Sequence, residues 1–414
     1  MSIPPPIVRA FKGLYPRKEH AAAVAAPPYD TVSVDEAHRL ADGNPFSFLH
    51  ISRAEIDLPE GTHPYAPEVY EKARENFDRL ISSRVLLRST RPRYYAYRLT
   101  KDDSHTQTGL VATASVAAYE SGRIRRHELT RPDKENDRVR QIGALDAQTG
   151  PALLAHPDND EAERLVAEIA DGVPIIDLEN ADGVRHTLWE TSSGAIDSRV
   201  DEVFGALPTL YIADGHHRSA AAARIAAARR GLGAPDSCEY FLSVIFPARQ
   251  MRILSYNRAV RDLNGLSVGA FLEAVDKYCL VTPLSGASQP ERTGVFSLCL
   301  GERWYRLAVR PEYIPVSDPV RRIDVSLLSE TILARILGIT DLRRDTRIDF
   351  VGGVKGLKEL ERRVKGGEMA AAFALHPTPL SELMSVADAG EIMPPKSTWF
   401  EPKLADGLVS HVLD

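Results

Sequence analysis

The chain has 414 residues, 43% of them hydrophobic and 26% charged, as in a soluble globular protein, and at about 100 to 200 residues per domain we expect two or three lobes. Its formal net charge of −6 argues against nucleic acid as a partner. Three widely spaced cysteines, Cys238, Cys279 and Cys299, form neither a disulfide framework nor a zinc pattern, and prolines replace the apolar core of a signal peptide at residues 1–9. Because the chain also lacks a long apolar run, we expect a cytoplasmic protein that binds no membrane.

The spacing of apolar residues predicts helices and strands in mixed order. Helices are expected at residues 33–41, 67–83, 160–170, 216–230, 268–278, 325–337, 355–365 and 380–386. Strands are expected at residues 93–100, 109–120, 151–156, 184–190, 210–214, 240–246, 295–300, 304–309 and 370–375, with a turn at residues 101–106. This order predicts an α+β fold of mixed sheets rather than a doubly wound one. We divide it into a lobe at residues 1–250, which carries the candidate site, and a second α+β lobe at residues 251–414 packed against it.

A dense run of charged residues at 125–138 is the first candidate site. A capping residue and a proline predict that a helix begins near residue 132. Lys134 and Arg138 then lie four residues apart on one face of it, where two cations can bind a polyphosphate. Glu128 precedes this helix and is a candidate general base toward a hydroxyl if the fold brings it near Asp214. The alternative is a solvated face with ordinary ion pairs.

The strand, turn and helix at residues 210–230 are the most informative part of the chain. A glycine in the turn lets the backbone approach a ligand, and the free amides at the start of the helix favour an anion. The expected ligand is therefore a phosphate. The residues predicted to bind the phosphates of a nucleotide here are Gly215, His216, His217, Arg218 and Ser219.

Asp214 stands at the end of that strand, where it is expected to hold a magnesium ion or to accept a proton. We count Asp214 and His217 as catalytic candidates with Glu128. A transition metal shared by His216 and His217 is disfavoured, because adjacent side chains diverge. The alternative for the whole loop is an ordinary Asp-Gly turn with histidines that cap a helix.

Two proline-containing segments remain. Pro27-Pro28-Tyr29-Asp30 reads first as a rigid turn, with Asp30 a substrate contact only if the fold carries it into the cleft. Residues 393–398 hold Lys396 in an extended loop beside polar hydroxyls, but the glycine cradle of a P-loop is absent. A structural role, with Trp399 and Phe400 as core anchors, is at least as well supported.

Taken together, these motifs resemble one family in order and spacing, the one catalogued as domain of unknown function 1015. The motifs are Pro27-Pro28-Tyr29-Asp30, Asn44-Pro45, His127-Glu128 with Lys134 and Arg138, Asp214-Gly215-His216-His217-Arg218, Tyr256-Asn257-Arg258 and Met393-Pro394-Pro395-Lys396-Ser397-Thr398. The loop that begins at Asp214 is also similar to the phosphate loop of the ParB and sulfiredoxin superfamily, which includes kinases of free serine. His216 stands where sulfiredoxin has its cysteine, so the redox chemistry of that branch is not expected.

This second resemblance implies a phosphate-binding core of the ParB and sulfiredoxin type, nucleotide phosphates at residues 215–218, and a carboxylate, for which Glu128 is the candidate, that activates the acceptor hydroxyl. We therefore expect a small-molecule kinase that uses ATP or ADP with Mg²⁺ to convert free L-serine into O-phospho-L-serine. Two alternatives stay open: a non-catalytic nucleotide-binding regulator and a metal-dependent phosphohydrolase. The sequence identifies neither donor nor acceptor, and it leaves a homodimer open.

Overall fold

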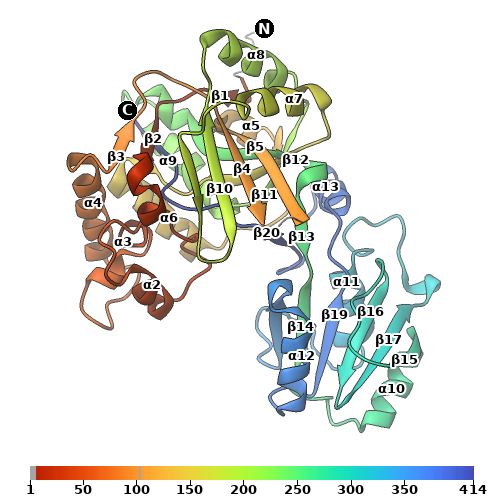
Figure 1. Ribbon diagram of the computed structural model, residues 1–414. Coiled ribbons are helices and arrows are strands. Elements are labelled where there is room, and N and C mark those ends of the chain that lie inside the picture. The colour runs from red at the N-terminus through yellow and green to blue at the C-terminus, as the bar shows by residue number, and fades with distance from the viewer. Residues whose placement is uncertain (1–5, 102–103) are drawn as a thin grey trace. The chain divides into compact units, whose positions relative to one another are not determined.

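The computed structural model describes residues 6–101 and 104–414 of the chain (Figure 1). These fall into two compact units, one formed by Met1–Met251 with Pro402–Asp414 and the other by Arg252–Glu401. The boundary at Met251 lies one residue from the expected one. The last residues of the chain, which we had assigned to the second lobe, belong instead to the first unit, because they pair with its strands.

The first unit is built on a mixed sheet that has nine strands over the described residues, in the order β6-β11-β8-β12-β5-β4-β10-β9 with β1 beside β5. The strands are β1 Val8–Arg9, β4 Tyr95–Lys101, β5 His105–Ser115, β6 Ile124–Arg125, β8 Ala152–His156, β9 Ile176–Glu179, β10 Val184–Glu190, β11 Leu210–Asp214 and β12 Tyr240–Pro247. Every residue of β12 is buried, as expected for a central strand covered on both faces.

Parallel pairing at one edge of this sheet positions the candidate site. β6 and β11 run parallel, with Ile124 opposite Leu210 and Arg125 opposite Tyr211. The two strands therefore end at the same edge, and the loops that follow them, although far apart in sequence, lie side by side.

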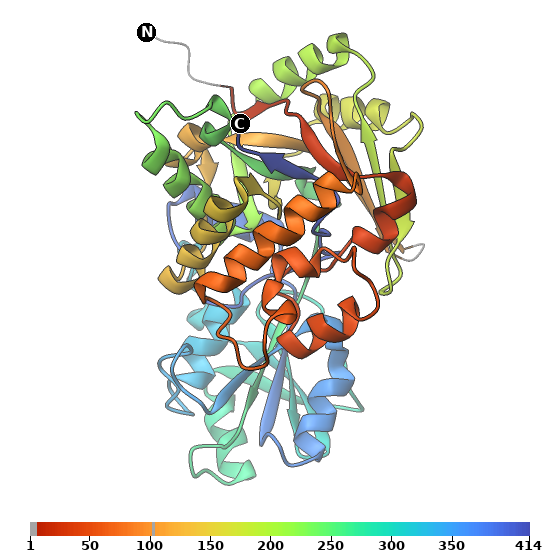
Figure 2. The ribbon, with the colours of Figure 1, turned by 90° about the vertical axis from the view of Figure 1, so that its left-hand side faces the viewer.

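The helices of the first unit are α1 Ala21–Val24, α2 Val34–Ala41, α3 Leu49–Ser52, α4 Pro67–Ser82, α5 Val116–Glu120, α6 Pro132–Leu145, α7 Asp160–Ile169, α8 Gly194–Gly205 and α9 His216–Arg229. Helix α6 packs against both α4 and α9 (Figure 2). The alanine-rich face of α9 buries Ala222 and Ala226 in the main core with Leu154, Ile212 and Ile245. Small side chains let this helix lie close to the sheet.

A second, smaller sheet joins segments from both ends of the chain. Its order is β3-β2-β21-β7, with β2 Gly13–Pro16, β3 Leu86–Arg88, β7 Ala147–Gln148 and β21 Ser410–Val412. Because β21 pairs with β2 and β7, the segment that precedes it, with Lys403 and Asp406, is held in the first unit.

The second unit contains a six-stranded sheet, counted over the described residues, in the order β15-β17-β16-β19-β14-β18. Its strands are β14 Tyr256–Val260, β15 Cys279–Leu284, β16 Val295–Leu300, β17 Arg303–Val309, β18 Ile348–Gly352 and β19 Ala371–Leu375, and β13 Arg252–Leu254 pairs separately with β20 Trp399–Glu401. Its helices are α10 Val268–Asp276, α11 Asp324–Leu328, α12 Gly356–Lys365 and α13 Leu380–Asp388. All pairs in this sheet are antiparallel, and the α+β class predicted for the chain is confirmed.

Two predicted elements end early. The strand expected at residues 109–120 stops at Ser115, whose hydroxyl accepts from the Ala118 amide at 3.2 Å and caps α5. The helix expected at residues 325–337 gives way after Leu328 to a π-helical turn, Ser329–Leu333, where the Ser329 hydroxyl donates to the Val325 carbonyl.

Two parts of the predictions lie outside the described residues. They are residues 102 and 103 of the turn predicted at 101–106, and residues 1–5 of the proline-rich start. Within the described part of the chain, none of the helices combines the length and apolar character that crossing a membrane requires.

Candidate functional site

The loop between β11 and α9 has the geometry of an anion site. Gly215 is the N-cap of α9 and adopts φ +95°, a left-handed conformation that favours glycine. The Ser219 amide donates to the Gly215 carbonyl at 2.9 Å and starts the helical ladder. The amides of His216, His217 and Arg218 precede that bond, at the positive end of the helix dipole. A phosphate placed there would meet both backbone donors and a favourable field.

We expect Gly215→Ala to disrupt this loop. The left-handed φ would strain an alanine by about 1 to 2 kcal/mol, and a Cβ atom would lie 3.0 Å from the Ala152 Cα atom. Gly183→Ala is the matched control, because Gly183 has φ +72° but nothing within 4 Å of the added atom. Urea unfolding should show a loss of stability in both variants, and calorimetry should show weaker nucleotide binding for Gly215→Ala alone. Equal nucleotide binding by the two variants would argue against a phosphate at this loop.

Asp214 is ionised and shielded by a lysine. Its Oδ1 atom accepts from the Gly215 amide at 2.7 Å, and its Oδ2 atom accepts from Lys403 Nζ at 3.0 Å. Burial alone would raise the pKa of Asp214, but the Lys403 ammonium and the Arg218 guanidinium hold it well below its usual range. Since both oxygens already accept hydrogen bonds, a magnesium ion on Asp214 would have to displace Lys403. That ion stays a prediction.

The two adjacent histidines face different partners. His217 accepts at Nε2 from the Arg131 amide at 3.0 Å, which places the proton of its neutral ring on Nδ1. Burial lowers the pKa of His217 against the opposing effect of Asp30, so the ring is neutral at physiological pH. His217 is therefore a candidate hydrogen-bond donor to a phosphate oxygen.

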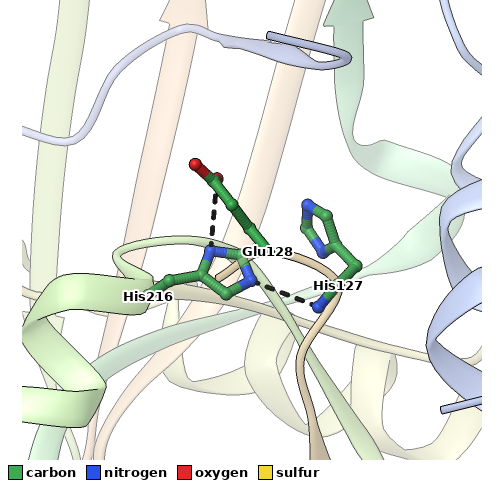
Figure 3. A group of neighbouring side chains, drawn as sticks. All are labelled: His127, Glu128 and His216. Atoms are coloured by element: carbon green, nitrogen blue, oxygen red, sulfur yellow. Dashed lines mark hydrogen bonds and ion pairs between the residues drawn. The ribbon is translucent and has the colours of Figure 1, made fainter. Parts of the chain in front are cut away.

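His216 lies against His127 and Glu128, which come from the loop after β6 (Figure 3). The His127 amide donates to His216 Nε2 at 3.4 Å, and His216 Nδ1 lies 3.8 Å from a carboxylate oxygen of Glu128. The fold thus brings Glu128, the predicted general base, to the first residue of α9, two positions from Asp214.

The same three side chains are a candidate metal site. One ligand atom from each of His127, Glu128 and His216 lies within 4.8 Å of the others, and His127 Nδ1 is buried without a hydrogen-bond partner in the structure as described. The hydrogen bond to Nε2, however, fixes the tautomer of a neutral His216 with its proton on Nδ1, facing Glu128. A metal at Nδ1 would have to displace this proton. The observed arrangement favours a neutral imidazole with its Nδ1 proton on the side of the Glu128 carboxylate.

Burial keeps both imidazoles of this group uncharged. It lowers the pKa of His127 to about 4, although a hydrogen bond with the Ile212 backbone opposes the shift. Burial and the neighbouring His127 together lower the pKa of His216 well below 6.5.

We expect stability to fall as the pH drops from about 6.5 to about 4, since in this window the unfolded chain binds a proton at His127 that the folded chain does not. Above about 6.5 neither state is protonated and the contribution vanishes. His127 alone should account for a loss on the order of 2 kcal/mol between pH 7.5 and pH 5.0. Urea unfolding at both values should show a smaller loss in His127→Gln, and the full loss in the exposed control His38→Gln. An equal loss in both variants would contradict the assignment.

The remaining predicted phosphate ligands have other partners. Lys134 Nζ donates to the Tyr65 hydroxyl at 2.6 Å, and Arg138 donates to Asp137 at 2.7 Å. Helical spacing predicted that both cations lie on one face and bind the same phosphates. In the structure Lys134 and Arg138 contact different partners instead. The Ser219 hydroxyl donates to the Gly215 carbonyl at 3.2 Å and is fully buried, so it supports the helix start.

Two of the family motifs meet in the second unit. Arg258 is fully buried, lies 4.7 Å from the Phe350 ring centroid and donates to the carbonyls of Tyr256 at 2.6 Å and Lys396 at 2.9 Å. Lys396 adopts φ +60°, a turn rather than the extended loop we expected. The Ser397 hydroxyl donates to the Pro394 carbonyl at 2.7 Å, and the contacts of this segment are structural.

Sequence reasoning missed Lys403 and Asp406. Lys403 contacts Asp214, and Asp406 accepts at Oδ2 from the Tyr29 amide at 3.3 Å. Neither lies in a motif or a periodic pattern. Only the pairing of β21, close to the C-terminus, puts them beside residues from the start and the middle of the chain.

Comparison with known proteins gives one family and several similar structures. The family model described as a protein of unknown function (DUF1015) matches residues 8–326. A free serine kinase in complex with AMP is similar at 16% identity and a TM-score of 0.35, over 72% of this chain and 92% of that one. A conserved hypothetical protein from Pyrococcus furiosus is similar at 16% identity and a TM-score of 0.34, over 72% and 95%. SbnI with a C-terminal truncation, from Staphylococcus aureus, is similar at 12% identity and a TM-score of 0.37, over 72% of this chain and 85% of that one. No curated protein matches the chain.

Proposed function

The chain belongs to the family of proteins of unknown function DUF1015, and we propose that it is a small-molecule kinase that transfers a phosphoryl group from a nucleotide to a hydroxyl. Free L-serine is the proposed acceptor, O-phospho-L-serine the product, and ATP or ADP the donor. One observation supports this proposal: the Glu128 carboxylate lies 3.8 Å from His216, at the start of the helix whose amides form the proposed phosphate site.

These residues supply what phosphoryl transfer needs, namely positioning and charge neutralisation. The bond between the terminal phosphorus and its bridging oxygen breaks, and a bond from the acceptor oxygen to that phosphorus forms. Glu128 takes the hydroxyl proton, while the helix amides, His217 and the positive charges of Lys403 and Arg218 stabilise the transferring group. The nucleotide leaves shortened by one phosphate.

Magnesium is part of the proposal as an ion ligated by the nucleotide phosphates. Asp214 is its candidate protein ligand, provided that the nucleotide draws Lys403 away from the Oδ2 atom that it now contacts at 3.0 Å. When bound, the ion would neutralise phosphate charge. Without the ion, Lys403 supplies the positive charge next to this carboxylate.

A metal-dependent phosphohydrolase is the second candidate, because two neutral histidines and a carboxylate with ligand atoms within 4.8 Å form a set that a transition metal can use. The hydrogen bond on His216 Nε2 weighs against it. Binding without turnover would instead make the protein a nucleotide-binding regulator.

A phosphorus NMR time course separates these functions. The full chain is incubated with magnesium and ATP, ADP or pyrophosphate, with and without L-serine. Appearance of O-phosphoserine only when serine is present supports the kinase and identifies the donor. Release of inorganic phosphate without serine, increased by Zn²⁺ or Mn²⁺, favours the hydrolase and contradicts the kinase. Nucleotide binding without turnover of any donor favours the regulator.

A further inference from the structure

A small cavity in the first unit lies next to the loop between β11 and α9, which we call the phosphate loop, and the cavity shares only Arg218 with the chemistry described above. Its volume is about 30 Å³, and its lining includes Tyr29, Ser52, Arg138, Arg218 and Asp406. We call it the Tyr29 pocket. Its lining includes Tyr29 from the motif at residues 27–30, for which the sequence predicted a rigid turn, with Asp30 a substrate contact only if the fold carried it into the cleft.

The pocket holds two arginines on one aromatic ring. The guanidinium carbon of Arg138 lies 3.7 Å from the Tyr29 ring centroid, and that of Arg218 lies 5.9 Å from it. Each side chain is 12% exposed. Arg138 uses Nε and Nη2 for Asp137. Arg218 uses Nη1 for the Pro151 carbonyl, and its Nη2 lies 3.7 Å from an Asp30 oxygen, beyond hydrogen-bond length. Since a guanidinium has five donors, both keep capacity for a planar anion.

The lining also offers a carboxyl group and a hydroxyl without a hydrogen-bond partner in the part of the chain that the structure describes. Asp406 is 3% exposed, and burial raises its pKa to about 7 although Arg218 and Arg138 oppose the shift. Ser52 is 6% exposed, and its Oγ atom has no hydrogen-bond partner within the described chain. Buried polar atoms without partners are rare in folded proteins, and a ligand atom is one explanation for such a gap.

The volume restricts what can enter. A water-sized atom needs about 10 to 15 Å³ measured in this way, so about 30 Å³ admits two or three such atoms. A carboxylate group has that size, whereas a nucleotide base does not.

We propose that the Tyr29 pocket binds the carboxylate of a small α-amino acid on Arg138 and Arg218, with the ammonium on Asp406. This inference rests on the proposed kinase function and assigns the acceptor site. Arg218 links the two sites, because its backbone belongs to the first turn of α9 and its side chain lines the pocket. An acceptor held by its head group is thereby fixed beside the phosphate loop.

Gly150→Ala tests the pocket with little backbone disturbance. The added Cβ atom would lie 3.2 Å from Asp406 Oδ1 and 3.5 Å from Arg218 Cδ, so it would crowd the head group. Gly143→Ala is the control, since nothing lies within 4 Å of its Cβ atom. Calorimetry on the full chain, with and without ADP, would compare L-serine with glycolate, which lacks the ammonium, and ethanolamine, which lacks the carboxylate.

We expect L-serine to bind the natural protein and Gly143→Ala equally, and Gly150→Ala at least 10-fold more weakly, with ADP affinity unchanged in all three. Glycolate should bind more weakly than L-serine, and ethanolamine should not bind. Equal serine affinity in both variants, equal binding of ethanolamine and serine, or no binding of any carboxylate would overturn the inference. Binding is measured without turnover, so a failed phosphoryl transfer with intact serine binding would count against the kinase and not against the pocket.

Discussion

Glu128→Gln is expected to lower the rate of phosphoryl transfer to serine by about 10²- to 10⁴-fold, the usual contribution of a general base. The amide keeps the size of the side chain but cannot take the hydroxyl proton. Glu128 is half-exposed, and its carboxylate lies 3.8 Å from His216, beyond hydrogen-bond length, so the fold should tolerate the change. Nucleotide affinity should change less than about twofold, because the proposed donors to the phosphates are the amides of α9.

The measurement is single-turnover transfer to serine beside calorimetric titration with the nucleotide. Glu161→Gln is the matched control, because Glu161 is an exposed carboxylate on α7. A parallel loss of rate and nucleotide affinity in Glu128→Gln would assign Glu128 to nucleotide binding instead of proton transfer. A rate equal to that of the control would remove it from the chemistry.

Arg218→Ala is expected to weaken both the fold and nucleotide binding. The guanidinium donates to the Pro151 carbonyl and pairs with Asp30 at 3.7 Å. Burial alone would lower the pKa of Arg218, but Asp30 and Asp214 raise it, so the group stays charged. The Arg218 side chain is mostly buried, whereas Asp30 and Asp214 are partly exposed and solvent screens them, so we expect a loss of about 2 kcal/mol in the free energy of unfolding, less than for a fully buried pair.

Loss of this charge should also weaken nucleotide binding by about 10- to 100-fold, the equivalent of about 1.5 to 3 kcal/mol for a hydrogen bond to a charged group. Arg218→Lys keeps the charge without the planar fork and should recover stability more than affinity. Urea unfolding and nucleotide titration would be compared with Arg164→Ala, where Arg164 is exposed on α7. Unchanged nucleotide affinity in Arg218→Ala would exclude this arginine from nucleotide binding and leave it only its place in the Tyr29 pocket.

Local patterns in the sequence were sufficient for most long elements. β10 and β16 have the predicted bounds. β8, β12, α7 and α12 each differ from their own predicted bounds by one residue at one end. Apolar periodicity and caps act over a few residues, so they can be read from one segment at a time. The errors at Ser115 and Leu328 arose where a side-chain hydroxyl competes with the backbone ladder.

The short strands escaped prediction because their partners are distant. β2, β3, β7 and β21 have two to four residues each and form one sheet only when both ends of the chain meet. Such pairing has no periodic signal within any one of these segments.

The sequence by itself determined the α+β class and the strand, turn and helix that carry Gly215, because the left-handed glycine and the helix start are local features. Tertiary structure alone decided which side chains join that loop. Parallel pairing of β6 with β11 brought Glu128 to His216, and the pairing of β21 brought Lys403 to Asp214 and Asp406 to Tyr29. Packing of α6 also places Arg138 in the Tyr29 pocket. Helical spacing had instead predicted that Arg138 binds phosphate together with Lys134. Contacts between segments so far apart depend on sheet register and packing, which no single stretch of residues encodes.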